Sequence, residues 1–493
     1  MSAGERRRSS AVETGAFALL VAFAFVLPLR HAIVVPVDVP IVPFVGPTVE
    51  IPRGLSIGPV LAAALVVLWA LAVVLTLDVR RPHPFHAAFA LFFAFAAASY
   101  RWTIDPASTL TRIAILGYVF VLVVIAWDLL RTRRRVAAVA QAIVLGAFLV
   151  GIVGTWEVVQ QGGVTREGPL AYGANPNELA RWLVLAVPLS AGLLANSRRF
   201  GSGPFAYLNV AYLVAAPFMV LATGSRQGVV ALLVLAALGS VALVARRRTI
   251  RLRLRHVAVG LTLLGATLAA VRGVASFDAF LYRRPFALDR LGSLGGRTAY
   301  WAEGLEAFRE HRLRGVGAGA FGELTPEGMS ADPHNTFVGV AAELGAVGVV
   351  LFALAVVVPV VAVARRPGPT YSSVGILVAF ALFSTVAMLY NDPLNWLVLL
   401  LVLAAHSATT DDDWVRAGGL ATQLSDRSDA DDRIEPTTDS PPSSPESTGH
   451  PDSSGGILNA TDRSPDENPS SRSSDENPSS RSSDESPTSR SSE

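Results

Sequence analysis

The sequence contains no cysteine and no lysine over its 493 residues. Without cysteine there is no disulfide framework and no thiolate to act as nucleophile or metal ligand, and the redox compartment is left open. All 41 basic residues are therefore arginine. We attribute this bias first to the base composition of the genome, because a chemical need for guanidinium groups would not remove every lysine. Thiol chemistry is excluded from the functions considered below.

Charge is also scarce, since only 16% of the residues are charged and 51% are hydrophobic. The mean hydropathy is +0.45, and the apolar residues form blocks close to the roughly 20 residues that a helix needs to cross a bilayer. We predict an all-α polytopic membrane protein with about 12 transmembrane helices. The candidate spans are 14–29, 55–77, 84–99, 110–128, 136–156, 177–195, 205–222, 226–245, 256–275, 336–364, 371–390 and 393–408.

The two ends of the chain have opposite charge. From Asp411 onward 19 acidic residues accompany 7 arginines, whereas the preceding part has 34 arginines and 20 acidic residues. The acidic part is rich in serine and proline and ends in a nine-residue repeat that starts with "DENPSSRSS" at Asp466. Such a segment has too little apolar surface to offset its ordering entropy. We predict a membrane domain over 1–408 and a disordered acidic tail over 409–493.

Arginine placement predicts the topology. The clusters fall in alternate connections between spans, which the positive-inside rule assigns to the cytoplasm. Both termini are then cytoplasmic, and the long segment 276–335 between the ninth and tenth spans is an external loop. The clusters are Arg6 to Arg8, Arg80 and Arg81, Arg131 and Arg133 to Arg135, Arg198 and Arg199, Arg246 to Arg255, and Arg365 and Arg366.

The external loop contains "GGRTAYWAEGLEAFREHRLRGVGAGAFGEL". From Arg297 onward, apolar residues recur every three or four positions and predict a surface helix with one apolar stripe, formed by Tyr300, Trp301, Leu305 and Phe308. The glycine-rich "GVGAGAF" has no preceding strand and no following Lys-Ser/Thr, so we expect a flexible turn rather than a nucleotide loop. The arginines of this loop are either tolerated in a long external segment or form an anion site.

Further polar residues lie where predicted spans reach the external side. "YGANPNELARW" places Asn175, Asn177, Glu178 and Arg181 there, "TGSRQ" places Arg226, and "ADPHNTF" places His334 and Asn335. Ionisable groups at membrane depth are costly and usually face a cavity or a partner. The structural alternatives are an ion pair of Glu178 or Glu343 with a nearby arginine, and helix capping by the His334–Asn335 pair.

The segment from Asn175 to about Ala364 resembles the O-antigen ligase and O-antigen polymerase superfamily. The ligase signature has histidine, asparagine or a similar residue, nine positions, glycine, two positions and glycine. Here it reads His334, Asn335, nine residues, Gly345, two residues, Gly348. The stretches around Asn175, Arg226 and Arg297 resemble further family segments. One departure is Arg312 in "HRLRGVG", where the family commonly has proline, which puts the local turn in doubt.

The resemblance implies a membrane enzyme that moves a glycan from a polyprenyl or dolichyl diphosphate to an acceptor hydroxyl on the outer face. An imidazole can take the proton of the attacking hydroxyl, so His334 is the candidate base. Guanidinium groups can stabilise the departing diphosphate, and we assign this role to Arg226 and Arg297. The candidate substrate-binding residues are Asn175, Asn177, Glu178, Arg181, Trp301, Arg314 and Asn335.

We predict metal-independent transfer without a cofactor, because the loop has no convincing metal-ligand spacing. Inversion at the anomeric carbon rests on the resemblance alone. The partners are the lipid-linked glycan, a lipid or glycan acceptor and membrane lipids, with no role for nucleic acid. One alternative is a polysaccharide flippase or another multispanning transporter, although we find no internal repeat and no polar midplane site. Another is a receptor or scaffold that acts through its acidic tail.

Overall fold

The computed structural model describes residues 3–29, 34–35, 55–161, 175–196, 204–245, 297–325, 332–365 and 370–408. The chain divides into two units, 1–426 and 427–493, and all described residues belong to the first. The predicted ninth span, much of the predicted external loop and the predicted tail lie outside the described residues. The division of the chain at position 408 therefore stays a prediction.

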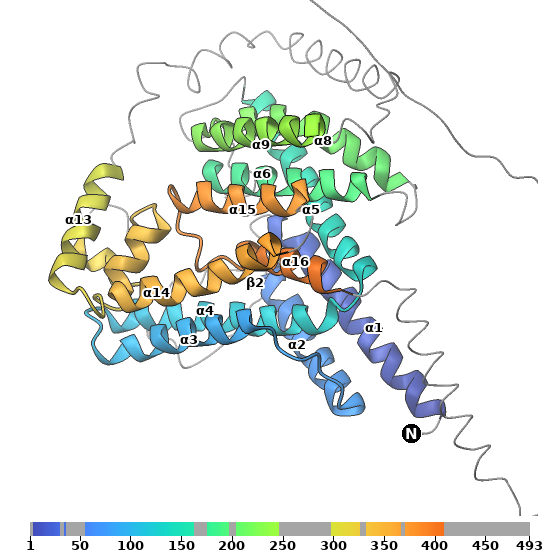
Figure 1. Cartoon of the computed structure of the whole chain (residues 1–493), viewed down its shortest axis with the longest axis horizontal. Coiled ribbons are helices and arrows are strands. Elements are labelled where there is room, and N and C mark those ends of the chain that lie inside the picture. Colours follow the sequence, from blue (N-terminus) through green and yellow to red (C-terminus); the bar gives the residue numbers. More distant parts are fainter. Residues whose placement is uncertain are drawn as a thin grey trace, which may run out of the picture. The chain divides into compact units, whose positions relative to one another are not determined.

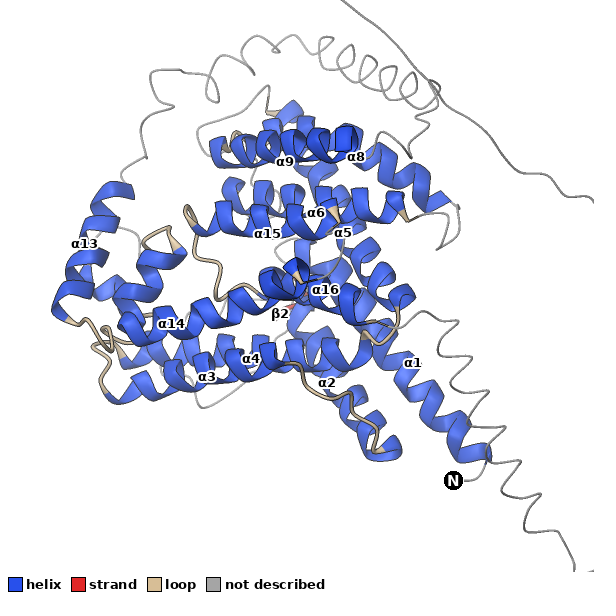
Figure 2. Cartoon of the chain, viewed as in Figure 1, coloured by secondary structure: helices blue, strands red, loops and turns tan. Residues whose placement is uncertain are grey.

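The described part is almost entirely helical (Figure 2). A single antiparallel pair joins strand β1 (Val34–Val35) to strand β2 (Leu55–Ser56) within these residues. The α-helices are α1 (Ala3–Val26), α2 (Ile57–Thr76), α3 (Pro84–Ala98), α4 (Pro106–Leu129), α5 (Arg133–Gln160), α6 (Pro176–Ala195), α8 (Pro204–Ala222), α9 (Arg226–Ala245), α13 (Arg297–Glu310), α14 (Thr336–Ala364), α15 (Tyr371–Ser384) and α16 (Pro393–Ser407). The 3-10 helices are η1 (Leu27–Leu29), η2 (Ser99–Arg101) and η4 (Ala320–Leu324).

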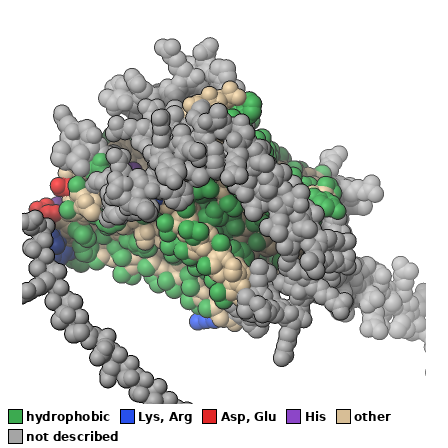
Figure 3. Space-filling model, turned by 90° about the horizontal axis from the view of Figure 1, so that it is seen from above, with side chains coloured by type: hydrophobic (Ala, Val, Ile, Leu, Met, Phe, Trp, Pro, Cys, Tyr) green, Lys and Arg blue, Asp and Glu red, His purple; other side chains and the backbone are tan. Residues whose placement is uncertain are grey.

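Eleven of the predicted spans correspond to these helices. Seven helices among the described residues are long and apolar enough to cross a membrane, namely α1, α2, α4, α5, α6, α8 and α14. The helices α9, α15 and α16 contain shorter apolar stretches. Apolar side chains also dominate the described surface that Figure 3 shows. The protein is thus a multi-pass, all-α membrane protein, while the total of 12 spans stays a prediction.

The helices lie in layers (Figure 1). In that view α3 and α4 lie below α14 and α16, and above these lie α15 and α6 and then α8 and α9. Helix α16 is central, and its residues Pro393 to Ala404 are all buried. Its Trp396 ring stacks on Phe89 of α3 with the ring centroids 4.2 Å apart. A helix that is apolar on every side is expected in the core of such a bundle.

Four helices begin at one end of the bundle, which we call the polar end. Asp105, Asn175, Asn335 and Asp392 cap α4, α6, α14 and α16 there, each through a side-chain oxygen that accepts backbone N–H groups of the first turn. Proline follows three of these caps at the first helical position, where its missing N–H costs nothing. The sequence therefore encodes where these helices start.

The opposite end is rich in arginine. Arg131 forms ion pairs with Asp78 at 2.5 Å and with Asp128 at 2.7 Å. The Arg80 guanidinium lies 3.8 Å from the centre of the Trp127 ring, and it also donates to the carbonyl oxygen of Ser407. The connections around 80 and 131 and the end of α16 therefore meet at one end, as the arginine pattern predicts. The side of the membrane on which this end lies stays a prediction.

Helix α14 is interrupted at Gly345, whose φ is 63° and ψ is −165°. The segment 312–317 docks on the interruption and replaces the missing helical hydrogen bonds. These bonds run from the N–H groups of Val316, Gly317 and Ala346 to the carbonyl oxygens of Ala342, Glu343 and Arg312, at 3.0, 2.9 and 2.7 Å. The first glycine of the signature is therefore required by backbone geometry, because this φ/ψ region is essentially restricted to glycine.

The glycine-rich run 315–319 is part of this docked segment. Residues 315 to 318 are buried, and the N–H of Ala318 donates to the Ser99 hydroxyl at 3.0 Å. Gly317 has φ 115°, and a Cβ there would collide with Thr103 in the connection before α4. The expectation of a flexible turn is wrong, because the run is a packed link between α14 and the α3–α4 connection.

Two further expectations need correction. The predicted surface helix is α13, which starts at Arg297 as expected, but the residues it buries are Gly304 and Ala307, while Leu305 is 45% exposed. The small residues allow close packing on α14, since a Cβ on Gly304 would lie against Val338. The predicted span 371–390 ends as a helix at Ser384, and the residues after it form a non-helical connection at the polar end.

Replacing Gly345 with alanine should destabilise the protein. The backbone conformation alone costs about 1–3 kcal/mol for a residue with a side chain, and the added Cβ would also collide with the backbone of Leu313. We expect a lower thermal midpoint in detergent and faster proteolysis of 312–317. Gly15→Ala in α1 is the control, because its Cβ would meet only Leu68, at an ordinary 3.6 Å. Equal midpoints for the two variants would contradict this account.

Candidate functional site

His334 lies at the polar end, immediately before the first turn of α14. Its φ is 49°, a left-handed conformation that is uncommon for a residue other than glycine. The Asp332 carboxylate accepts the backbone N–H of His334 at 2.7 Å and so supports this turn. The Tyr300 ring of α13 meets the imidazole edge to face, with the centroids 5.9 Å apart. His334 is therefore held from both sides and remains only partly buried.

The charge of Arg226 acts on Arg297, although 71 positions separate the two residues in the sequence. Burial lowers the pKa of the Arg297 guanidinium, and the positive charge of Arg226 lowers that pKa further, while Asp332 opposes both effects. Two guanidinium groups of like charge and a carboxylate thus influence one another. Among the described residues no acidic group forms an ion pair with Arg297, and Asp332 is a carboxyl whose charge acts on it.

Asp332 joins these groups to His334. Burial raises the pKa of the Asp332 carboxyl, whereas the N–H and charge of His334 and the charges of Arg112 and Arg181 act to lower it. The charge of the same carboxyl also acts on Arg297. Electrostatic interactions thus link Arg226 to Arg297, Arg297 to Asp332, and Asp332 to His334. The convergence of the three candidate catalytic residues in one pocket stays a prediction.

The other candidate residues make contacts within the protein. Asn175 and Asn335 use their side-chain oxygens as helix caps, and Asn177 accepts the Ser225 hydroxyl at 2.7 Å. Trp301 donates its indole N–H to the carbonyl oxygen of Pro333 at 3.1 Å and thereby fixes the turn before His334. The capping alternative is thus observed for Asn335. Substrate binding by these four residues stays a prediction.

Arg181 and Glu178 also have partners within the protein. Arg181 is 6% exposed and pairs with Asp392 at 2.6 Å and with Glu178 at 3.6 Å. The pairing of Glu178 with a nearby arginine is the structural alternative that the sequence left open. The ion pair between Arg181 and Asp392 therefore links α6 to the start of α16. Removal of either partner would leave a buried charge unpaired. Its contact with substrate stays a prediction.

Arg314 lies beside Trp102, in the connection between α3 and α4. Its guanidinium lies 5.6 Å from the centre of the Trp102 ring, and its carbonyl oxygen accepts the Trp102 indole N–H at 3.2 Å. Together with Arg309 and Arg312 it lines an open depression beside the α3–α4 connection. Nothing in the described residues joins this arginine to His334, so we leave it out of the reaction proposed below.

A comparison with protein families identifies this region. Residues 211–353 match the O-antigen ligase family. The predicted resemblance is confirmed. The matched O-antigen ligase region contains Arg226, Arg297, His334 and both signature glycines, so it includes every residue with a proposed role in catalysis. A search of curated proteins finds no match. The match indicates a membrane glycosyltransferase of the ligase or polymerase type.

The sequence reasoning missed Arg112, which lies outside the O-antigen ligase region. This α4 residue donates from Nη1 to the Asn391 amide oxygen at 2.5 Å, with the amide oriented so that its nitrogen donates to the Met388 carbonyl oxygen. The guanidinium carbon lies 5.1 Å from the centre of the Tyr390 ring. Only its position in an otherwise apolar predicted span could have drawn attention to Arg112.

Glu343 is a buried carboxylate near Arg112. It is fully buried in α14, and it accepts the hydroxyl of Tyr390 from the non-helical connection 385–392. One of its oxygens has no hydrogen-bond partner among the described residues. The sequence offered an ion pair of Glu343 with a nearby arginine as an alternative. This ion pair is not formed within the described residues, where Glu343 accepts a hydrogen bond from Tyr390 instead. Within the described residues no group of three or more acidic, histidine or cysteine side chains could hold a metal ion.

Proposed function

We propose that the protein transfers a glycan from a polyprenyl or dolichyl diphosphate donor to an acceptor hydroxyl at the outer face of the membrane. The observation that carries the proposal is that electrostatic interactions link His334 through Asp332 to Arg297 and Arg226, with all four residues inside the region that matches the O-antigen ligase family. The arginine-rich opposite end supports the outward orientation, because cytoplasmic ends of membrane proteins are enriched in arginine.

The reaction replaces one bond at the anomeric carbon by another. The acceptor oxygen attacks that carbon, and His334 takes the proton from the hydroxyl as the new C–O bond forms. The bond to the phosphate oxygen breaks, and the lipid diphosphate leaves with the electron pair. Arg226 and Arg297 offset the charge that develops on it through planar, permanently charged donors. In-line attack inverts the configuration, and no step needs a metal ion.

Reconstitution of the purified protein in vesicles with a lipid-linked oligosaccharide tests the proposal. Both acceptor classes should be offered, a lipid-linked core and a second copy of the lipid-linked glycan. We expect a joined glycan and free lipid diphosphate in equal amounts, in the presence of a metal chelator. Addition to the core would mark a ligase, and chain extension would mark a polymerase. Relocation of an unchanged donor across the bilayer would instead support the transporter alternative.

A further inference from the structure

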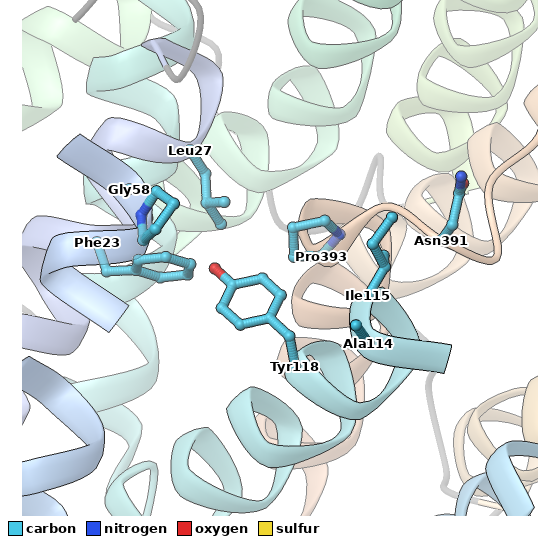
Figure 4. A pocket seen from close by; sticks show the side chains of 9 residues that line it. Phe23, Leu27, Gly58, Ala114, Ile115, Tyr118, Asn391 and Pro393 are labelled. Atoms are coloured by element: carbon cyan, nitrogen blue, oxygen red, sulfur yellow. The ribbon is translucent and has the colours of Figure 1, made fainter. Parts of the chain in front are cut away.

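Two cavities of similar volume lie between the helices. The cavity in Figure 4 has a volume of about 480 Å³ and is lined by apolar side chains together with Tyr118 and Asn391, and none of its described lining residues is charged. The other has a volume of about 470 Å³ and is lined by residues of α5, α6, α15 and α16. We call it the α15 cavity. Both volumes are within the roughly 300–1,000 Å³ of ordinary ligand sites, and the α15 cavity has charge in its lining as well.

The α15 cavity begins at the arginine-rich end of the bundle. Its lining includes the residues at which its four helices begin or end there, namely Arg133, Asn196, Thr370 and His406. Helices α6 and α15 lie side by side in Figure 1. Ala140 also lines the cavity, and because it follows Arg133 by seven residues of α5, the lining extends about 10 Å into the bundle.

The mouth of the cavity carries positive charge that no carboxylate pairs with. Arg133 is exposed, and among the described residues it forms no ion pair, whereas Arg131 and Arg135 beside it both have carboxylate partners. The Nδ1 of His406 donates to the carbonyl oxygen of Val402 at 2.7 Å, which leaves Nε2 without a partner within the described residues. None of the described residues that line the cavity is acidic.

The start of α15 adds hydrogen-bond donors to this mouth. Thr370 caps the helix by accepting the N–H of Ser373 at 3.2 Å, and the hydroxyl of Ser372 faces the cavity lining without a hydrogen-bond partner among the described residues. The positive end of a helix dipole favours an anion. Carbonyl oxygens at the ends of α6 and α16 would oppose one, but side chains of Asn196 and His406 donate to them, at 2.8 and 2.7 Å.

Farther into the bundle the lining is apolar. It consists there of Val136, Ala140, Leu189, Leu193, Ile376 and Leu401. A phosphate with an attached hydrocarbon chain matches both parts, because the phosphate suits the guanidinium of Arg133 and the chain covers the apolar wall. A free phosphate would leave that wall uncovered, and a zwitterionic phospholipid would bring a second cation to Arg133.

We propose that the α15 cavity binds an anionic phospholipid, with its phosphate between Arg133 and His406 and one acyl chain against the apolar wall. Basic pockets between transmembrane helices on the cytoplasmic side are typical sites for anionic head groups. The lipid would join four helices at the end opposite to the candidate site. This inference goes beyond the proposed function and does not depend on it.

Photolabelling of the full chain in detergent tests the site. The probe is phosphatidylglycerol with a diazirine in the middle of one acyl chain. We expect labelled peptides around Leu189 of α6 and Ile376 of α15, and loss of the label with excess phosphatidylglycerol but not with phosphatidylcholine or glycerol phosphate. Equal displacement by phosphatidylcholine would overturn the role of charge, and displacement by glycerol phosphate would indicate an anion site without lipid.

The competing occupant is the acidic stretch Asp411 to Asp413, which follows α16 in the sequence. If this stretch fills the mouth, the peptides around Leu189 and Ile376 should remain unlabelled in the full chain. That result would overturn the assignment to a lipid.

Ala140→Leu should narrow the α15 cavity, because Ala140 is buried and lines it. We expect labelling to fall about tenfold or more, since the added carbons take the place of buried carbons of the acyl chain. Gly58→Leu is the matched control, because it fills the cavity in Figure 4, where a Cβ on Gly58 meets no atom within 4 Å. It should label normally. Equal effects of the two substitutions would contradict the proposal.

Arg133→Gln tests the contact with the phosphate at an exposed position, where the substitution leaves the packing of the helices unchanged. We expect labelling by phosphatidylglycerol to fall about tenfold, because a charged hydrogen bond is lost. Arg134→Gln removes the same charge from the next residue, which is exposed and does not line the cavity. It should label nearly as well as the unmodified protein. Equal losses in the two variants would mean that the arginine-rich end attracts anionic lipid diffusely, and the site would be rejected.

Discussion

Substitution of His334 with alanine is expected to lower the rate of glycan transfer by about 10²- to 10⁴-fold, the usual contribution of a positioned base. The proton of the acceptor hydroxyl would then have to leave without a general base. Binding of the donor should be little changed, because the proposed contacts with the diphosphate come from arginine. The measurement is the single-turnover rate in vesicles with saturating lipid-linked donor.

Two further experiments distinguish the loss of a catalytic base from a loss of structure. His334→Asn retains a residue that tolerates the left-handed conformation observed here, yet an amide cannot accept the proton at neutral pH. It should be as inactive as the alanine variant while keeping its thermal midpoint. Added imidazole should partly restore transfer by His334→Ala and leave His334→Asn unaffected, because only the smaller side chain leaves space. Full activity in His334→Asn would remove the imidazole from the reaction.

Local physical signals in the sequence account for most of the helices. Apolar blocks placed eleven spans, and capping residues followed by proline, as at Asp105 and Asp392, mark where helices begin. What the pattern could not show was the end of α15 at Ser384. The residues after it remain apolar enough to continue a helix. Contacts with other segments keep them in a non-helical conformation. Thr336 provides one such partner, since its hydroxyl donates to the carbonyl oxygen of Ala387 at 2.6 Å.

The candidate site was predictable in part. His334, Arg226 and Arg297 stand in recognisable segments, and their types suit the chemistry of a leaving diphosphate. Asp332 and Arg112 were not found, because their importance arises from contacts between distant segments that no spacing encodes. The role of Gly345 was likewise hidden, since a signature glycine can mark flexibility or a fixed backbone. Only the docking of 312–317 on α14 shows that it is fixed.

Replacement of Arg226 or Arg297 with glutamine should slow transfer by about 10²- to 10³-fold each, the range measured when one donor to a developing negative charge is removed. Both guanidinium groups are proposed to contact the same diphosphate. Their effects should therefore not multiply, and the double variant should lose less than the product of the single losses. Lysine at either position should restore part of the rate, because it keeps the charge without the paired donors.

Arg309 provides the matched control on the same helix as Arg297. It is exposed and pairs with Glu306 at 2.9 Å, and exposed pairs of this kind contribute little. Arg309→Gln should therefore leave the transfer rate within about twofold of the unmodified protein. A general need for positive charge along α13 would instead make Arg309→Gln and Arg297→Gln equally slow. Strictly multiplicative losses at Arg226 and Arg297 would mean that the two arginines act on separate groups, and the shared diphosphate would have to be abandoned.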